Sequence, residues 1–183
     1  MKYVMLLFFI MPFSVFSQKI NGIEIPDKAK NILINIMNKS GVDEVTITSA
    51  YRSAEQQVNV MYNYISMYGI NNAKKLYGPE GDTVVDVYAV EKKAGKTVQE
   101  IKQSMLRELK IQLPSAIANN RLMHVGREEK FIVFDISISK IKPSGLVNKF
   151  QETANSMVTE GILHRFLGTE SGEKDALHFE ILK

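Results

Sequence analysis

The 183-residue sequence contains no cysteine. The chain therefore forms no disulfide bond, and it offers no thiolate as a metal ligand or as a nucleophile. A metal site or a catalytic centre has to be built from imidazoles, carboxylates and other nitrogen or oxygen groups. Histidine is scarce as well, because only His124, His164 and His178 occur.

The sequence also lacks a block of charge of one sign. It has 23 lysine and arginine residues against 20 acidic residues, which gives a formal net charge of +3. Short charged runs such as EKK and REEK mix both signs, which is typical of a solvated surface. We therefore expect no nucleic-acid partner.

Long hydrophobic runs are limited to residues 1–17, MKYVMLLFFIMPFSVFS. Lys2 precedes an apolar stretch shorter than the ~20 residues of a membrane span, and Val15 and Ser17 place small residues at its end. This order is typical of a cleaved secretory signal. A buried first helix or an uncleaved anchor is the alternative. We predict an exported protein, periplasmic or secreted, with one domain over residues 18–183 and no stable membrane span after cleavage.

Hydrophobic periodicity predicts the secondary structure of the remaining chain. Helical spacing predicts helices over residues 25–41, 54–69, 97–111 and 143–161, with one short helix before a Gly-Pro turn in 70–81. The valines of residues 83–95 favour a strand, whereas the length and the ending of this run favour a helix, and we predict a helix. A capping box is expected at Thr97 and Glu100. Alternating, β-branched runs predict strands over residues 44–50, 130–139, 162–168 and 176–182. Helices followed by clustered strands favour an α+β fold, with an antiparallel sheet and flanking helices.

The end of the chain places one histidine between two acids. His178 follows Asp175 by three residues and precedes Glu180 by two, so alternation puts His178 and Glu180 on one face of a strand. Asp135 stands inside an apolar strand, where an unpaired carboxylate would be costly to bury. A zinc ion bound by His124, Asp135 and His178, with water as the fourth ligand, would satisfy all three side chains. A structural role for the histidines is the alternative.

His164 lies in the run ILHRFLG, between apolar neighbours. We predict that it is structural, or that it supports a ligand, and that it does not bind the metal itself.

Three blocks of the sequence resemble the zinc D-Ala-D-Ala carboxypeptidases and L-Ala-D-Glu endopeptidases, which cut peptidoglycan stem peptides. The blocks are TSAYRSAEQQ, MHVGREEKFIVFDIS and DALHFEI. They occur in the order found in that family and span nearly all of the chain after residue 17. The resemblance implies a hedgehog/DD-peptidase-like fold and a zinc-dependent peptidase whose substrate is a cell-wall peptide.

The resemblance also implies roles for particular residues. It makes His124, Asp135 and His178 the metal ligands, with zinc as the metal. Asp175 takes the place of the catalytic acid before the last histidine, where it acts as the general base towards a metal-activated water and later protonates the leaving amine.

Two polar residues of the first block take the place of substrate-binding residues. Arg52 corresponds to the arginine that polarises the scissile carbonyl or holds a substrate carboxylate, which suits the fixed fork of its donors. Gln57, five residues later, corresponds to a glutamine that faces the substrate.

The sequence departs from the family in two places. The eleven-residue step from His124 to Asp135 is longer than usual, so the segment GREEK is expected to bulge out as a loop. Leu122 stands where the family has a serine. These departures leave open an inactive module that binds a cell-wall peptide or a protein partner. The further alternative, an exported structural domain without metal, requires the match of the three blocks to be a coincidence.

Overall fold

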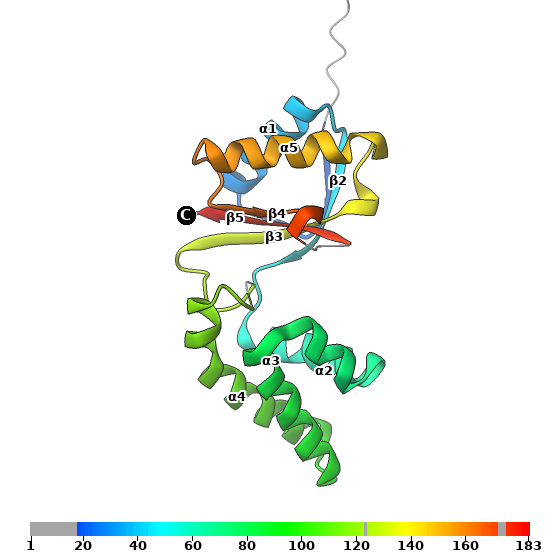
Figure 1. Ribbon diagram of the computed structural model, residues 1–183, viewed down its shortest axis with the longest axis vertical. Coiled ribbons are helices and arrows are strands. Elements are labelled where there is room, and N and C mark those ends of the chain that lie inside the picture. Colours follow the sequence, from blue (N-terminus) through cyan, green and yellow to red (C-terminus); the bar gives the residue numbers. More distant parts are fainter. Residues whose placement is uncertain (1–17, 123, 172–174) are drawn as a thin grey trace, which may run out of the picture.

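The computed structural model describes residues 18–122, 124–171 and 175–183. The predicted signal peptide, residues 1–17, lies outside the described residues. The described chain forms two lobes, one above the other in Figure 1. We call residues 19–50 and 131–182 the sheet lobe and residues 54–118 the helical lobe.

The sheet lobe contains one five-stranded sheet with the strand order β1-β2-β3-β5-β4. Its strands are β1 (Lys19–Gly22), β2 (Glu44–Ala50), β3 (Phe131–Ser137), β4 (Arg165–Leu167) and β5 (Ala176–Leu182). The four strands that the sequence predicts all form. The long strands β3 and β5 pair along their whole length.

The sheet is mixed, and the predicted antiparallel sheet is wrong in this respect. β1 pairs with β2 in parallel, whereas the other pairs are antiparallel. Parallel neighbours need a crossover connection, and the helix α1 (Asp27–Ser40) provides it. The four residues of β1 are too short for alternation to predict a strand. The broader prediction of an α+β fold is confirmed.

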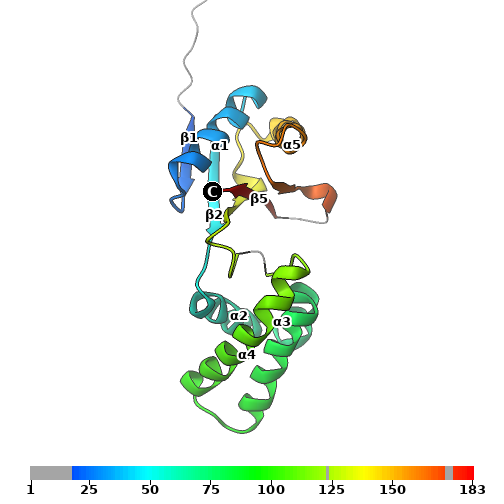
Figure 2. The ribbon, with the colours of Figure 1, turned by 90° about the vertical axis from the view of Figure 1, so that its left-hand side faces the viewer.

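Two helices cover one face of the sheet, α1 and α5 (Val147–Thr159), and in Figure 2 both lie above β5, on the side away from the helical lobe. Alternation along β3 and β5 sends Phe134 and Phe179 to this face, where both are fully buried with Phe150 of α5. The opposite face carries Asp135 and His178 and is turned towards the helical lobe. The register between β3 and β5 therefore places the apolar core on one face of the sheet and the polar side chains of Asp135 and His178 on the other face.

The helical lobe consists of α2 (Ala54–Tyr68), α3 (Ile70–Lys93) and α4 (Val98–Ala118). They pack around a second core that is separate from that of the sheet lobe. The predicted capping box of α4 is confirmed, because the Thr97 side chain accepts a hydrogen bond from the backbone N–H of Glu100 and the Glu100 side chain accepts one in return. Ser53 and Gln56 make the same arrangement at the start of α2.

Gly78 and Pro79 bend α3 instead of ending it in a turn. Gly78 has φ 68 and ψ −178, which breaks the helical geometry inside α3. Proline also lacks the N–H that a continuous helix needs. The predicted short helix and the helix after it are therefore joined across a kink, and this brings the first half of α3 beside α2.

Three short 3₁₀ helices complete the described secondary structure: η1 (Ile138–Lys140), η2 (Ser144–Leu146) and η3 (Thr169–Ser171). Within the described ranges, no helix has both the length and the hydropathy of a membrane span.

Candidate metal centre

The sheet register brings together two of the predicted ligands. Asp135 of β3 is directly opposite His178 of β5, and Ser49 of β2 is opposite Asp135. Directly paired residues point to the same face of a sheet. The Nδ1 atom of His178 consequently lies 2.8 Å from Oδ1 of Asp135.

The third predicted ligand comes from the segment after α4. The Nε2 atom of His124 lies 3.0 Å from Oδ2 of Asp135, and its ring meets that of His178 edge to face at 5.0 Å. Two hydrogen bonds hold His124 to the end of β2. Its Nδ1–H donates to the carbonyl of Ala50 at 3.0 Å, and its own carbonyl accepts from the N–H of Arg52 at 2.8 Å.

His124, Asp135 and His178 each offer a ligand atom, and these atoms lie within 4.8 Å of one another. Each imidazole uses its other nitrogen elsewhere, His124 on Ala50 and His178 on Glu180 at 3.3 Å. A neutral imidazole has a hydrogen on only one nitrogen. Both inner nitrogens would then aim lone pairs at the Asp135 carboxylate, an arrangement that needs a bound cation or two protonated rings.

This donor set fits a zinc ion. Histidines that bind zinc regularly donate their other N–H to a carboxylate or a backbone carbonyl. The Glu180 carboxylate and the Ala50 carbonyl are such acceptors. Two imidazoles and one carboxylate also match the ligands of catalytic zinc sites, which keep a fourth position open.

The electrostatics of the metal-free centre follow from the same contacts. Burial alone would raise the pKa of Asp135, but hydrogen bonds with His124 and His178 hold that pKa well below its usual range. Burial would lower the pKa of His178, yet hydrogen bonds to Asp135 and Glu180 raise it. In the absence of metal, His178 is therefore stabilised as a cation beside an ionised Asp135.

The centre lies at the side of a cleft of about 360 Å³ between the two lobes. Arg52 and Gln57 line this cleft together with the three predicted ligands. Arg52 donates from Nη1 to Oε1 of Gln57 at 3.2 Å and from Nη2 to Oγ of Ser49 at 2.6 Å. These two bonds fix the guanidinium of Arg52 at the junction of the lobes. Gln57 therefore contributes to the cleft by holding this guanidinium in place.

The opposite wall of the cleft is apolar and aromatic. It consists of side chains from α2, from the first half of α3 and from the segment after α4: Val60, Tyr64, Leu76, Tyr77 and Leu122. Burial raises the pKa of Tyr77 to about 12, so its hydroxyl stays protonated. Leu122 has a φ of 49, a conformation that leucine rarely adopts.

Asp175 precedes β5 at the edge of the sheet lobe. It is exposed one residue before β5, its carbonyl accepts a hydrogen bond from Ile138, and it is not among the described residues that line the cleft. Its role as the general base stays a prediction.

His164 is exposed, and its ring packs on that of Phe131 at 4.6 Å. It is not one of the three residues whose ligand atoms converge.

Glu180 and Arg127 are partners of the centre for which the sequence predicts no role. Glu180 is 0% exposed and Arg127 is 7% exposed, and Nη1 of Arg127 lies 3.3 Å from Oε1 of Glu180. The segment GREEK is a loop, but Arg127 turns inward instead of bulging out. The alternation of His178 and Glu180 along the strand is the only sequence signal for this contact.

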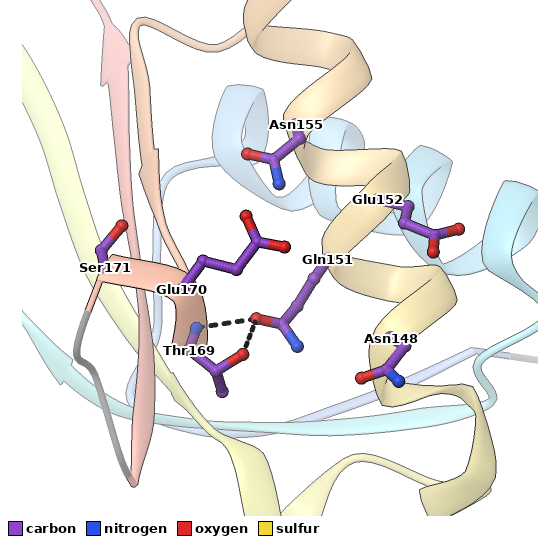
Figure 3. Close-up of a pocket in the computed structure, with 8 residues that line it drawn as sticks. Asn148, Gln151, Glu152, Asn155, Thr169, Glu170 and Ser171 are labelled. Atoms are coloured by element: carbon purple, nitrogen blue, oxygen red, sulfur yellow. Dashed lines mark hydrogen bonds between the residues drawn. The ribbon is translucent and has the colours of Figure 1, made fainter.

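A second cavity, of about 230 Å³, lies between α5 and η3 and is drawn in Figure 3. Its lining is polar, and Oε1 of Gln151 accepts hydrogen bonds from the N–H and the hydroxyl of Thr169. None of the three converging residues lines it, so the inter-lobe cleft is the candidate site. A scan against protein-family models, a search of curated proteins and a search of solved structures found no match for this chain.

Proposed function

We propose that this chain is an exported zinc-dependent peptidase that cleaves peptidoglycan stem peptides, with a hedgehog/DD-peptidase-like fold. The observation that carries the proposal is the arrangement of the two imidazoles. Each has its outer nitrogen held by an acceptor and its inner nitrogen aimed at Asp135. The motif resemblance supplies the reaction class and the substrate.

In this proposal His124, Asp135 and His178 hold the zinc ion. Zinc bound in this way supplies Lewis acidity and lowers the pKa of a water ligand to ~7. Ala50 and Glu180 fix the orientation of the two imidazoles, so that their free nitrogens keep facing the same point.

Arg52 binds an anionic oxygen of the substrate. Its hydrogen bonds to Ser49 and Gln57 use two donors of the guanidinium, and the other donors remain for a carboxylate or for charge that develops on the scissile carbonyl. The apolar wall excludes water from the opposite side of the bound peptide.

Asp175 takes the proton from the attacking water and returns it to the leaving amine. It is tied to the metal centre through the chain, because His178 follows three residues later in β5, which begins one residue after Asp175. Its exposed position before the strand requires the carboxylate to turn towards the cleft when substrate binds.

The position of Asp175 also favours a second candidate function, an inactive module that binds a cell-wall peptide or a protein partner. Among the described residues that line the cleft, Asp135 is the one carboxylate, and it is engaged by both histidines. Such a module would keep the metal and the cleft without a base for proton transfer.

Two measurements test the proposal. Elemental analysis of the purified chain should give one equivalent of zinc for the wild type and for His164→Gln, and none for a folded His178→Ala variant. Incubation with a muropeptide, followed by mass spectrometry of the products, should show release of a peptide fragment or an amino acid. Zinc without cleavage would favour the binding module, and full zinc in His178→Ala would refute the ligand assignment.

A further inference from the structure

Arg127 joins the two lobes through the interior of the molecule. It lies in the segment between His124 and β3 and is 7% exposed. Its Nη1 atom donates to both oxygens of Glu180, at 3.3 and 3.4 Å. Its Nη2 atom donates to the carbonyl of Ile117 at 3.0 Å and to Oδ1 of Asn120 at 2.9 Å. One guanidinium thus bridges the C-terminal end of α4 and the centre of the sheet.

The residue at the sheet end of this bridge also contacts the metal centre. Glu180 is fully buried, and its Oε1 atom lies 3.3 Å from Nε2 of His178. The hydrogen bond from Nε2 to Glu180 leaves Nδ1 of His178 as the nitrogen that faces Asp135. Whatever fixes the Glu180 carboxylate therefore fixes the tilt of the His178 ring.

A second arginine beside Glu180 offers a natural comparison. Arg165 of β4 reaches Oε1 of Glu180 at 3.6 Å, and its side chain is 29% exposed against 6% for that of Arg127. No hydrogen bond joins Arg165 to Glu180 among the described residues. Both arginines place positive charge near the carboxylate, but only Arg127 also binds the end of α4.

We infer that Arg127 is a positioning residue, which orients His178 for metal binding through Glu180 and makes that orientation depend on the docking of α4 against the sheet. The inference rests on the proposed metal function. It also explains the long segment between His124 and Asp135, because this segment contains Arg127, the residue that bridges the lobes.

The principal test compares Arg127→Met with the matched variant Arg165→Met in the full chain. Zinc affinity is measured by competition with a chromophoric chelator. Loss of the hydrogen-bonded partner of a metal ligand typically weakens metal binding 10- to 100-fold. Arg127 holds that partner, Glu180, and does not contact His178 itself, so we expect Arg127→Met to weaken zinc binding by up to about 10-fold. Arg165→Met should stay within about threefold of the wild type, because partly exposed ion pairs contribute little. Equal losses in the two variants, or wild-type affinity in Arg127→Met, would overturn the inference.

Two further variants separate positioning from folding. Arg127→Lys keeps the charge but lacks the fork that serves Glu180, Ile117 and Asn120 together, so it should recover part of the affinity. Asn120→Gly removes one acceptor of Arg127 and suits the φ of 55 at this position. It should weaken zinc binding by roughly threefold or more, between the effects of Arg165→Met and Arg127→Met. If Arg127→Met does not fold, Asn120→Gly and Arg127→Lys decide the question, and wild-type affinity in both would overturn the inference.

A spectroscopic measurement is independent of the metal. In the metal-free protein, ¹⁵N chemical shifts of the His178 ring should show a hydrogen on Nε2 that persists in Arg165→Met and exchanges with solvent more rapidly in Arg127→Met. An unchanged His178 ring in Arg127→Met would overturn the inference even if the wild type bound no zinc. Absence of zinc from the wild type would instead refute the proposed function.

Discussion

The sheet lobe and the helical lobe differ in how they are packed and in what they contribute to the cleft. The sheet lobe is built around phenylalanine, with Phe134 and Phe179 stacked at 4.9 Å and Phe166 tilted against Phe179. The buried core of the helical lobe contains no phenylalanine; it consists mainly of aliphatic side chains and methionine, among them Met61 and Met105, with Tyr88 as its one buried aromatic residue in the described cluster. The sheet lobe carries Asp135 and His178, whereas the helical lobe provides most of the apolar wall.

This difference shows how the two parts of a site divide their tasks. A metal centre requires ligand atoms held in fixed relative positions, and paired strands with aromatic packing behind them provide this. A cleft wall needs shape and apolar surface, which helices provide with less constraint on each side chain. Metal binding should therefore depend mainly on the sheet lobe, with the helical lobe acting on it through the docking contact of Arg127 at the end of α4, and substrate choice should depend on the helical lobe.

The largest effect is expected where the sheet lobe supplies proton transfer. Asp175→Asn keeps the size of the side chain but removes its basicity, and a positioned acid–base group contributes roughly 10²- to 10⁴-fold. We expect hydrolysis of a muropeptide to fall by that factor, with KM and the zinc content unchanged. Hydrolysis at close to the wild-type rate would mean that another group carries the proton.

A pair of core substitutions tests the division between the lobes directly. Phe179→Ala should lower the free energy of unfolding by about 3–5 kcal/mol, and Met105→Ala by about 2–5 kcal/mol, as measured by urea denaturation. Phe179 lies between His178 and Glu180 in β5, so its loss should also weaken zinc binding. Met105→Ala should leave zinc affinity within about twofold of the wild type. If Met105→Ala weakened zinc binding as much as Phe179→Ala, the two lobes would not divide the site in this way.

Arg52→Ala tests the residue at the junction of the lobes. A hydrogen bond to a charged partner contributes about 1.5–3 kcal/mol, so kcat/KM should fall roughly 10- to 100-fold. The melting temperature should fall little, because the bonds of Arg52 to Ser49 and Gln57 are local. A large drop in melting temperature with a proportionate loss of activity would assign Arg52 to the fold instead.

The smallest expected effect is an opposite response of the lobes to pH in the metal-free protein. The raised pKa of His178 contributes stability that is complete below the ordinary value near 6.5 and is lost as pH rises through its folded pKa. Hydrogen bonds from Arg121 and Asn119 lower the pKa of Glu80 to about 2. The stability that Glu80 gives the helical lobe is present above pH ~4.5 and is lost as pH falls towards 2.

Thermal unfolding across this pH range measures both responses. Without metal, the melting temperature should decline by a few degrees above pH ~6.5, and saturating zinc should abolish this decline because it replaces the proton on His178. Asp135 also titrates on the acid side, so Glu80→Gln isolates the contribution of the helical lobe. If the melting temperature of Glu80→Gln fell at low pH as steeply as that of the wild type, Glu80 would not stabilise the helical lobe.

Much of the sheet and most of the helices could be predicted because their signals are local. β2 and β5 have the predicted bounds, β3 begins one residue after and ends two residues before its predicted run, and Thr97 and Glu100 cap α4 as expected. β1 could not be predicted, because four residues carry no periodicity and its partner β2 lies beyond α1. The kink at Gly78 could not be predicted, because glycine followed by proline is typical of a turn between two helices and also of a bend within one helix. Packing against the neighbouring helices decides between the two.

The sequence by itself determined which chemistry this protein can carry. Without cysteine, and with three histidines, a metal centre is limited to imidazole and carboxylate ligands, and the run DALHFEI puts His178 and Glu180 on one strand face. Only the tertiary structure decided that Asp135 is opposite His178, that His124 meets them from the end of a distant segment, and that Arg127 turns inward. These facts depend on strand register and on the docking of two lobes, which arise from contacts between residues far apart in the chain.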